Sequence, residues 1–143
     1  MDNNLRREII IDNYQNPMNK KLVDDDSYLS TNYNNESCID NLTLQMKIED
    51  NIIKDIVFDG EACAISTSAT SIFIRSLIGK SVDEAKKIII NYNNMLQEKE
   101  YDKDLLGELI VYSEISKQPN RITCALLPST CITRMLEELD KHN

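Results

Sequence analysis

The sequence contains no tryptophan, a single histidine and only three glycines among its 143 residues. The histidine, His142, is the penultimate residue, where chain ends fray, so we do not expect it to be a metal ligand. Cations are also scarce: 16 Lys and Arg stand against 24 Asp and Glu, for a net charge of −8. A nucleic-acid partner needs a continuous basic stripe. The composition therefore argues against nucleic acid and favours a protein partner with a basic face.

Long apolar runs are missing as well. The longest candidates, residues 52–58 and 88–90, fall far below the roughly 20 residues of a membrane span. Residues 1–7 pass straight into charged and amide residues and lack the apolar segment of a secretory signal. We therefore expect a cytoplasmic protein that does not associate with a membrane. In a reducing compartment, its four cysteines are more often metal ligands, reactive thiols or buried apolar residues than disulfides.

The rest of the composition is that of an ordinary globular protein, 41% hydrophobic and 28% charged. A chain of this length can bury about two thirds of the surface that it exposes when unfolded. Neither disulfides nor oligomerisation is needed to explain folding. Because no internal repeat or linker interrupts the sequence, we expect a single domain over residues 1–143.

The clearest local pattern lies in residues 42–48, where every second residue from Leu42 to Ile48 is apolar. This period of two predicts a strand with one buried face. Asp50 and Asn51 mark a tight turn, and the β-branched residues 52–58 predict a second strand, which completes an antiparallel hairpin. A further edge strand is expected at residues 28–32.

Helical patterns surround the hairpin. Residues 62–78 are small or apolar and stop at Gly79, which predicts a buried helix with a glycine just past its end. Ser81 and Glu84 form a capping box for a helix that continues to about residue 97. A short helix at residues 4–14 opens the chain. Its apolar stripe consists of Leu5, Ile9, Ile10 and Tyr14.

The C-terminal part is also predicted to be helical. Residues 105–110 form a short helical stretch, and Pro119 interrupts the chain before the next element. The last helix is expected from about Cys124 or Ser129 to Leu139. The sum is an α+β domain, a small antiparallel β-sheet with helices packed on one face.

Three of the four cysteines fall at expected ends of elements, where functional groups often lie. Cys38 is in a polar loop, two residues before Asp40 and close to the first hairpin strand. Cys63 stands where the second strand gives way to the buried helix, so the partial positive charge of the helix N-terminus can stabilise its thiolate. Cys124 follows the break at Pro119 and begins the last helix.

The spacing of these cysteines does not by itself identify a site. Their intervals of 25 and 61 residues match no compact zinc ribbon of paired C-x-x-C knuckles, so metal ligands and buried thiols stay equally open. Cys131 differs from the other three. On one helix with Cys124 it would lie about 10 Å further along the axis, too far to share a zinc ion. We expect Cys131 to be a buried apolar thiol.

The residues around the cysteines carry a more specific signal. Four segments occur in order: Asn16-Pro17-Met18-Asn19, residues 34–40 around Cys38, residues 58–66 around Cys63, and residues 121–127 around Cys124. In this order they resemble the U-type proteins of iron–sulfur cluster assembly, which are SufU, IscU and the N-terminal domain of NifU. The resemblance covers about residues 14–139, and residues 60–66 are its most specific part. It implies the SufE/IscU-like fold, a small sheet with helices over one face, in agreement with the patterns above.

Within this family the sequence is most similar to the SufU branch. Thr123 stands where IscU-like proteins have a histidine just before the third cysteine, and the proline-proline chaperone motif of IscU is missing. Arg121 occupies the position of an arginine of SufU-like proteins. Ile39 and Ala62 replace glycines of the family, which reduces backbone freedom beside Cys38.

The resemblance implies that Cys38, Asp40, Cys63 and Cys124 bind one Zn²⁺ ion. The protein would be a zinc-dependent sulfurtransferase that takes persulfide sulfur from a SufS-type cysteine desulfurase and relays it to downstream iron–sulfur assembly proteins. Cys38, in the most polar loop, is the expected sulfur acceptor. Three thiolates and a carboxylate leave an excess of negative charge around zinc, which we expect Arg121 to offset.

Two other functions stay open. The same thiols can hold iron, so the alternative is a scaffold on which an iron–sulfur cluster is assembled and from which it is transferred. The third possibility is a zinc-stabilised protein that has lost transfer chemistry.

Overall fold

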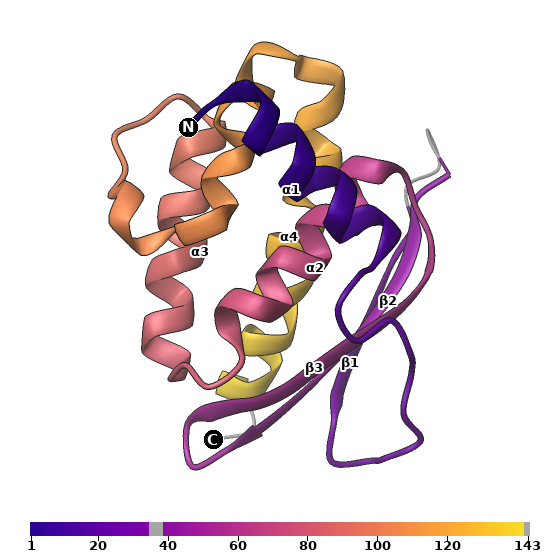
Figure 1. The fold of residues 1–143 in the computed structure, drawn as a ribbon. Coiled ribbons are helices and arrows are strands. Elements are labelled where there is room, and N and C mark those ends of the chain that lie inside the picture. The colour runs from indigo at the N-terminus through magenta and orange to yellow at the C-terminus, as the bar shows by residue number, and fades with distance from the viewer. Residues whose placement is uncertain (35–38, 142–143) are drawn as a thin grey trace.

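A computed structural model describes residues 1–34 and 39–141. Its helices lie together on one face of a three-stranded antiparallel sheet (Figure 1), which confirms the expected α+β class. The elements are α1 (Asn3–Gln15), β1 (Leu29–Asn34), β2 (Asn41–Glu49), β3 (Ile52–Glu61), α2 (Ala64–Leu77), α3 (Val82–Leu96), the 3₁₀ segments η1 (Lys103–Leu105) and η2 (Gly107–Lys117), and α4 (Pro119–Lys141).

The sheet has the strand order β1-β2-β3 and contains the predicted hairpin. Leu42, Leu44 and Met46 of β2 are fully buried, as their alternation predicted. The turn residues Asp50 and Asn51 both have positive φ, 53° and 63°. This left-handed pair is what a two-residue hairpin turn requires, and Asp and Asn tolerate it. The edge strand near residue 30 is confirmed as β1, and β3 continues to Glu61 rather than ending at residue 58.

Helix α2 is the central element, and every residue from 65 to 74 is buried, which confirms the predicted buried helix. Five of these side chains carry hydroxyl groups, and buried hydroxyls need hydrogen-bond partners. Ser68 bonds to Tyr112 of η2 at 2.6 Å, and Ser71 donates to Asn13 of α1 at 2.7 Å. The hydroxyl groups therefore connect α2 to the elements packed around it.

The ends of α2 and the start of α3 follow the sequence signals. Cys63 is the N-cap of α2, and its sulfur accepts the backbone N–H of Ser66. Gly79 follows the C-cap of α2 with a φ of 89°, a conformation that glycine adopts without steric cost. The capping box between Ser81 and Glu84 is present at the start of α3. These predictions are confirmed.

Helix α4 begins earlier than expected, at Pro119 rather than near Cys124 or Ser129. A proline fits the first turn of a helix, because the N–H that it lacks would have no partner there. Pro119 therefore starts the helix instead of interrupting the chain before it. As a result, Cys124 lies in the second turn of α4 and not at its start. A second proline, Pro128, lies inside the same helix.

Helix α1 forms where predicted, but its apolar stripe is only partly covered. Ile9 and Ile10 pack against the core, whereas Leu5 and Tyr14 are each 47% exposed. Leu5 and Tyr14 lie near opposite ends of α1, and a helix that crosses its neighbour at an angle contacts it over only part of its length. Buried Asn13, in the last turn of α1, bonds to Ser71 of α2 and adds a polar contact to this packing surface.

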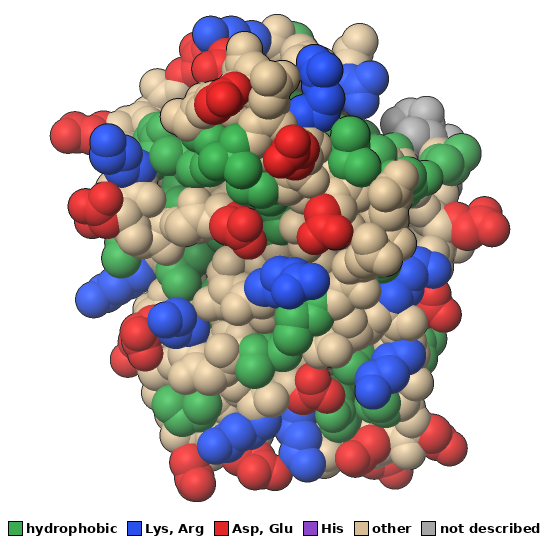
Figure 2. Space-filling view, in the orientation of Figure 1, with side chains coloured by type: hydrophobic (Ala, Val, Ile, Leu, Met, Phe, Trp, Pro, Cys, Tyr) green, Lys and Arg blue, Asp and Glu red, His purple; other side chains and the backbone are tan. Residues whose placement is uncertain are grey.

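The surface of the molecule carries charges of both signs. On the face shown in Figure 2, Lys and Arg side chains are interspersed with Asp and Glu, without a continuous basic stripe. Within the described part of the chain, no helix combines the length and the apolar character needed to cross a membrane.

Candidate metal site

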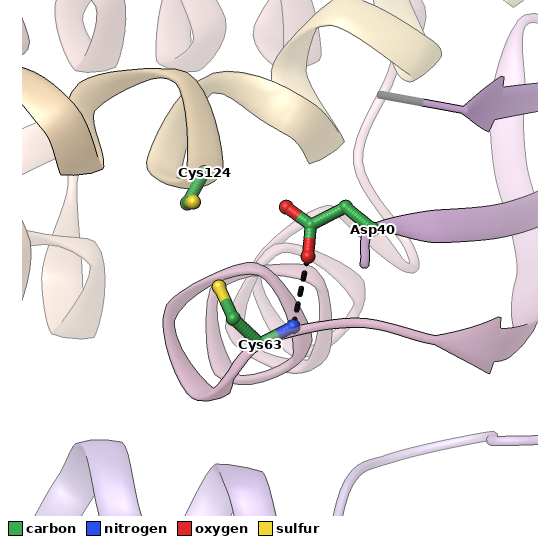
Figure 3. Close-up of side chains that lie close together, drawn as sticks. All are labelled: Asp40, Cys63 and Cys124. Atoms are coloured by element: carbon green, nitrogen blue, oxygen red, sulfur yellow. Dashed lines mark hydrogen bonds between the residues drawn. The ribbon is translucent and has the colours of Figure 1, made fainter. Parts of the chain in front are cut away.

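Asp40, Cys63 and Cys124 converge from three parts of the fold. Asp40 precedes β2, Cys63 lies between β3 and α2, and Cys124 belongs to α4. One ligand atom from each residue lies within 4.8 Å of the others, and Figure 3 shows the three side chains close together. Three of the four residues expected to hold a metal ion are therefore neighbours in space, although 61 positions separate the two cysteines.

The hairpin register brings Asp40 next to Cys63. Asn41 pairs with Glu61 and Leu42 with Gly60, so the start of β2 and the end of β3 lie side by side. Gly60 has a φ of +131°, and a Cβ atom there would overlap the carbonyl oxygen of Asn41. The two backbones approach each other closely at this point, which glycine permits because it has no side chain.

Asp40 is held against the N-terminus of α2. The backbone N–H of Cys63 donates to Asp40 Oδ1 at 2.8 Å, the bond drawn in Figure 3, and the hydroxyl of Ser66 donates to Oδ2 at 2.7 Å. Asp40 is 1% exposed, and the positive end of the helix dipole favours a carboxylate there. Each carboxylate oxygen has two acceptor sites, so these bonds orient the group without preventing it from binding a cation.

Ser66 is the residue of this site that the sequence analysis missed. Its Oγ lies 2.7 Å from Asp40 Oδ2, 3.1 Å from the carbonyl oxygen of Cys124 and 3.5 Å from Cys63 Sγ. The single hydroxyl proton of Ser66 is shared between the two oxygen acceptors, and the thiol of Cys63 can donate to the hydroxyl. The available signal was its spacing. Ser66 follows Cys63 by three residues, which places both on one side of the first turn of a helix.

The environment of Cys124 disfavours a free thiolate. Burial raises the pKa of Cys124 to about 12, and neighbouring Cys63 and Asp40 contribute to the increase. A thiol with this pKa is protonated at neutral pH and is a weak nucleophile. A divalent cation held among the three residues would favour the thiolate of Cys124, because its positive charge stabilises the deprotonated sulfur.

Two other predictions concern Cys131 and residues outside the described part. Cys131 is fully buried, as predicted, and burial raises its pKa to about 11. Cys38 and His142 lie outside the described residues. The expected roles of Cys38 as fourth ligand and sulfur acceptor therefore stay predictions.

Arg121 lies in the first turn of α4, one helical turn before Cys124. Its side chain is exposed and lines a hollow of about 350 Å³ together with Arg6 and Arg7 of α1. This hollow also reaches Ile65, which follows Cys63 by two residues. Three arginines and Glu114 thus line this hollow, beside the turn of α4 that precedes Cys124.

The donor set suits a zinc ion. Thiolates and a carboxylate are among the groups that bind zinc in proteins, usually four around one ion. With Zn–S bonds of about 2.3 Å, two sulfurs on one ion lie no more than about 4.6 Å apart. The spread of at most 4.8 Å among the three residues is therefore compatible with one shared ion after a small inward movement.

Comparison with known proteins gives matches over most of the chain. The family described as "NifU-like N terminal domain" matches residues 5–125. The zinc-dependent sulfurtransferase SufU of Bacillus subtilis (strain 168) is 36% identical over 124 residues, which are 86% of this chain and 83% of that protein. The iron–sulfur cluster assembly scaffold protein IscU of Thermotoga maritima is 29% identical over 117 residues, 82% of each chain.

Solved structures share the fold. The crystal structure of a putative iron–sulfur cluster assembly scaffold protein for the SUF system, from Fervidobacterium islandicum AW-1, superposes with a TM-score of 0.83 at 31% identity. The match covers 90% of this chain and 94% of that chain. The N-terminal part of a nitrogen-fixing NifU-like protein from Brucella abortus has a TM-score of 0.83 at 17% identity, covers 95% of this chain and 94% of that chain, and supports the fold alone.

Proposed function

Because the chain belongs to the NifU-like N-terminal domain family, we propose that it acts in iron–sulfur cluster assembly as a zinc-dependent sulfurtransferase. It receives persulfide sulfur from a SufS-type cysteine desulfurase and relays it to downstream assembly proteins. The proposal takes residues 1–143 as one cytoplasmic domain. The observation that carries it is the convergence of Asp40, Cys63 and Cys124, in a chain 36% identical to a protein named as a zinc-dependent sulfurtransferase.

The proposed zinc ligands are Cys38, Asp40, Cys63 and Cys124. Bound zinc lowers the pKa of cysteine thiols and keeps them deprotonated at neutral pH. The chain's own hydrogen bonds support the site, since Ser66 and the N–H of Cys63 orient the carboxylate of Asp40. The partial burial of Cys63 and Cys124 limits the access of water to their sulfurs.

Cys38 is the proposed sulfur acceptor. Its thiolate attacks the outer sulfur of the desulfurase persulfide, and a new S–S bond forms while the S–S bond of the donor breaks. The desulfurase cysteine leaves as a thiolate, and the transferred sulfur stays on Cys38 as a persulfide. The exchange leaves the total oxidation state unchanged, so it needs no added oxidant or reductant.

Metal analysis combined with a desulfurase assay tests this function. We expect about one zinc ion per chain, stimulation of a SufS-type desulfurase supplied with cysteine, and a persulfide on Cys38 in mass spectra of the alkylated protein. Cys38→Ser should remove both the persulfide and the stimulation, because it removes the nucleophile. A persulfide found on Cys124 but never on Cys38 would refute the assignment of the acceptor.

The second candidate function is that of a cluster scaffold. It is favoured by the 29% identity to the scaffold protein IscU, and thiolates are the usual ligands of iron–sulfur clusters. A reconstituted cluster that passes to an apo-acceptor protein, without stimulation of the desulfurase, is the result that selects this function. Zinc binding with neither activity selects a zinc-stabilised protein without transfer chemistry.

Arg121 is proposed to offset the negative charge of the ligand set from its place one turn before Cys124. We expect Arg121→Ala to weaken zinc binding about tenfold, as the loss of a supporting group around a metal site typically does, and to slow sulfur transfer. Lys141→Ala is the control, because it removes an exposed cation from the far end of the same helix. If Arg121→Ala matches the parent protein in zinc affinity and transfer rate, Arg121 has no such role.

A further inference from the structure

A proline inside α4 removes a backbone hydrogen bond beside the metal site. Pro128 follows Cys124 by four residues and has no N–H, so the carbonyl of Cys124 lacks the donor that an α-helix would otherwise provide. The hydroxyl of Ser66 can donate to the carbonyl of Cys124 in place of that N–H. Hydroxyl side chains also bond to the carbonyls of Ala125 and Leu126, whose α-helical donors at positions 129 and 130 are not proline. The bonds run from Ser66 to Cys124 (3.1 Å), from Tyr92 to Ala125 (2.7 Å) and from Ser129 to Leu126 (3.0 Å).

The bond from Ser66 links α4 to α2 at the cluster itself. Ser66 is fully buried, and its hydroxyl lies within hydrogen-bond distance of Asp40 as well as of the Cys124 carbonyl. Its backbone N–H donates to the sulfur of Cys63 at 3.4 Å. Ser66 therefore contacts all three members of the cluster, and its contact with Cys124 is made to the carbonyl that lacks the N–H donor of residue 128.

We propose that Pro128 and Ser66 act together as positioning residues that set the separation between Cys124 and the other two ligands. Pro128 keeps the carbonyl of Cys124 available, and Ser66 uses it to hold α4 against the start of α2. With another residue at position 128, a backbone N–H would bond to the carbonyl of Cys124 inside α4 and draw it toward the helix axis, so that its bond to Ser66 would become longer and weaker. This inference rests on the metal site of the proposed function, but it does not depend on sulfur transfer.

Pro128→Ala should lower zinc affinity without lowering thermal stability. We expect zinc binding, measured by competition with a chromophoric chelator, to weaken about tenfold. The thermal midpoint of the metal-free protein should stay equal or rise, because proline is unfavourable inside a helix. A purely structural role would lower both quantities together. Pro128→Val supplies the same N–H with a side chain of similar size and repeats the test if the alanine variant does not fold.

The proposal also predicts coupling between the two positions. Ser66→Ala alone should weaken zinc binding at least tenfold and shift the thiolate absorption bands of the Co²⁺-substituted protein. Because part of this effect passes through the carbonyl of Cys124, the same change should cost less in the Pro128→Ala background. Ser68→Ala is the matched control: Ser68 is equally buried on α2 and bonded, but its partner is Tyr112. We expect Ser68→Ala to change zinc affinity less than about twofold, as for groups remote from a site.

These measurements separate a failure of the metal site from a failure of the positioning role. A parent protein that does not bind zinc or Co²⁺ refutes the metal site and with it the proposed function. A parent that binds zinc while Pro128→Ala binds it equally well overturns the positioning role and leaves the metal site intact. Fully additive effects of Ser66→Ala and Pro128→Ala also overturn it, since they would show that the two residues act separately.

Discussion

Cys124→Ala should abolish stoichiometric zinc binding, whereas Cys131→Ala, seven residues further along the same helix, should preserve it. The sulfur of Cys124 lies within 4.8 Å of ligand atoms of Asp40 and Cys63, while Cys131 is fully buried in the hydrophobic core. Groups that only support a metal ligand are worth about 10–100-fold in affinity. Removing a ligand itself should therefore cost more than about 100-fold, and stimulation of the desulfurase should disappear with it.

Unfolding measurements with and without zinc separate the two variants. Cys131→Ala removes a buried sulfur and should lower the free energy of unfolding by about 1 kcal/mol, through lost packing alone. Zinc should still raise the unfolding midpoint of Cys131→Ala, because a ligand that binds the native state stabilises it. It should not do so for Cys124→Ala. Tight, stoichiometric zinc binding by Cys124→Ala would show that Cys124 is not a ligand.

Gly60→Ala should be strongly destabilising although it adds a single methyl group. The backbone of Gly60 has a φ of +131°, and the new Cβ would overlap the carbonyl oxygen of Asn41, which belongs to the paired strand and cannot rotate away. We expect a loss of about 3 kcal/mol or more in the free energy of unfolding. Since Asn41 follows Asp40, displacement of this backbone should also move the carboxylate and weaken zinc binding.

Gly79→Ala is the matched control for this prediction. Gly79 also has a positive φ, 89°, but a Cβ there would meet no atom within 4 Å. The change adds backbone strain of about 1–2 kcal/mol without an overlap, and it leaves zinc affinity as it is in the parent. Chemical denaturation and chelator competition on both variants measure the difference. Equal losses of stability in the two variants would contradict the role assigned to the close approach at Gly60.

The sequence predicted the β2–β3 hairpin correctly but placed the start of α4 too late, and both outcomes have physical reasons. The β2–β3 hairpin was predictable because alternation and the Asp50-Asn51 turn are local signals that agree with each other. The start of α4 was not, because a proline is compatible with both a break and the first turn of a helix. At Pro119 the outcome depends on packing, since Ala125 and Leu127 are fully buried in the core, and such contacts are not visible in the residues next to the proline.

The site was predictable in part. The hairpin register alone places Asp40 near Cys63, because the turn fixes which residues pair at the open end of the strands. That Cys124 belongs to the site, 61 residues after Cys63, was predictable only from the family resemblance, since the spacing of the cysteines matches no compact metal motif. The contributions of Ser66 and Pro128 depend on how closely α2 and α4 approach each other, which is a property of the packed structure.

The hydroxyl groups of α2 also restrict how this helix can turn about its own axis. Ser66 bonds to Asp40, Ser68 to Tyr112 and Ser71 to Asn13. An α-helix advances about 100° of rotation per residue, so a slip of one residue would carry all three hydroxyls away from their acceptors and leave them buried without partners. Apolar side chains alone resist such a slip less, because their contacts have no direction. These three bonds therefore fix the rotation of α2 about its axis, and with it the direction of the Cys63 sulfur at the N-cap of the helix.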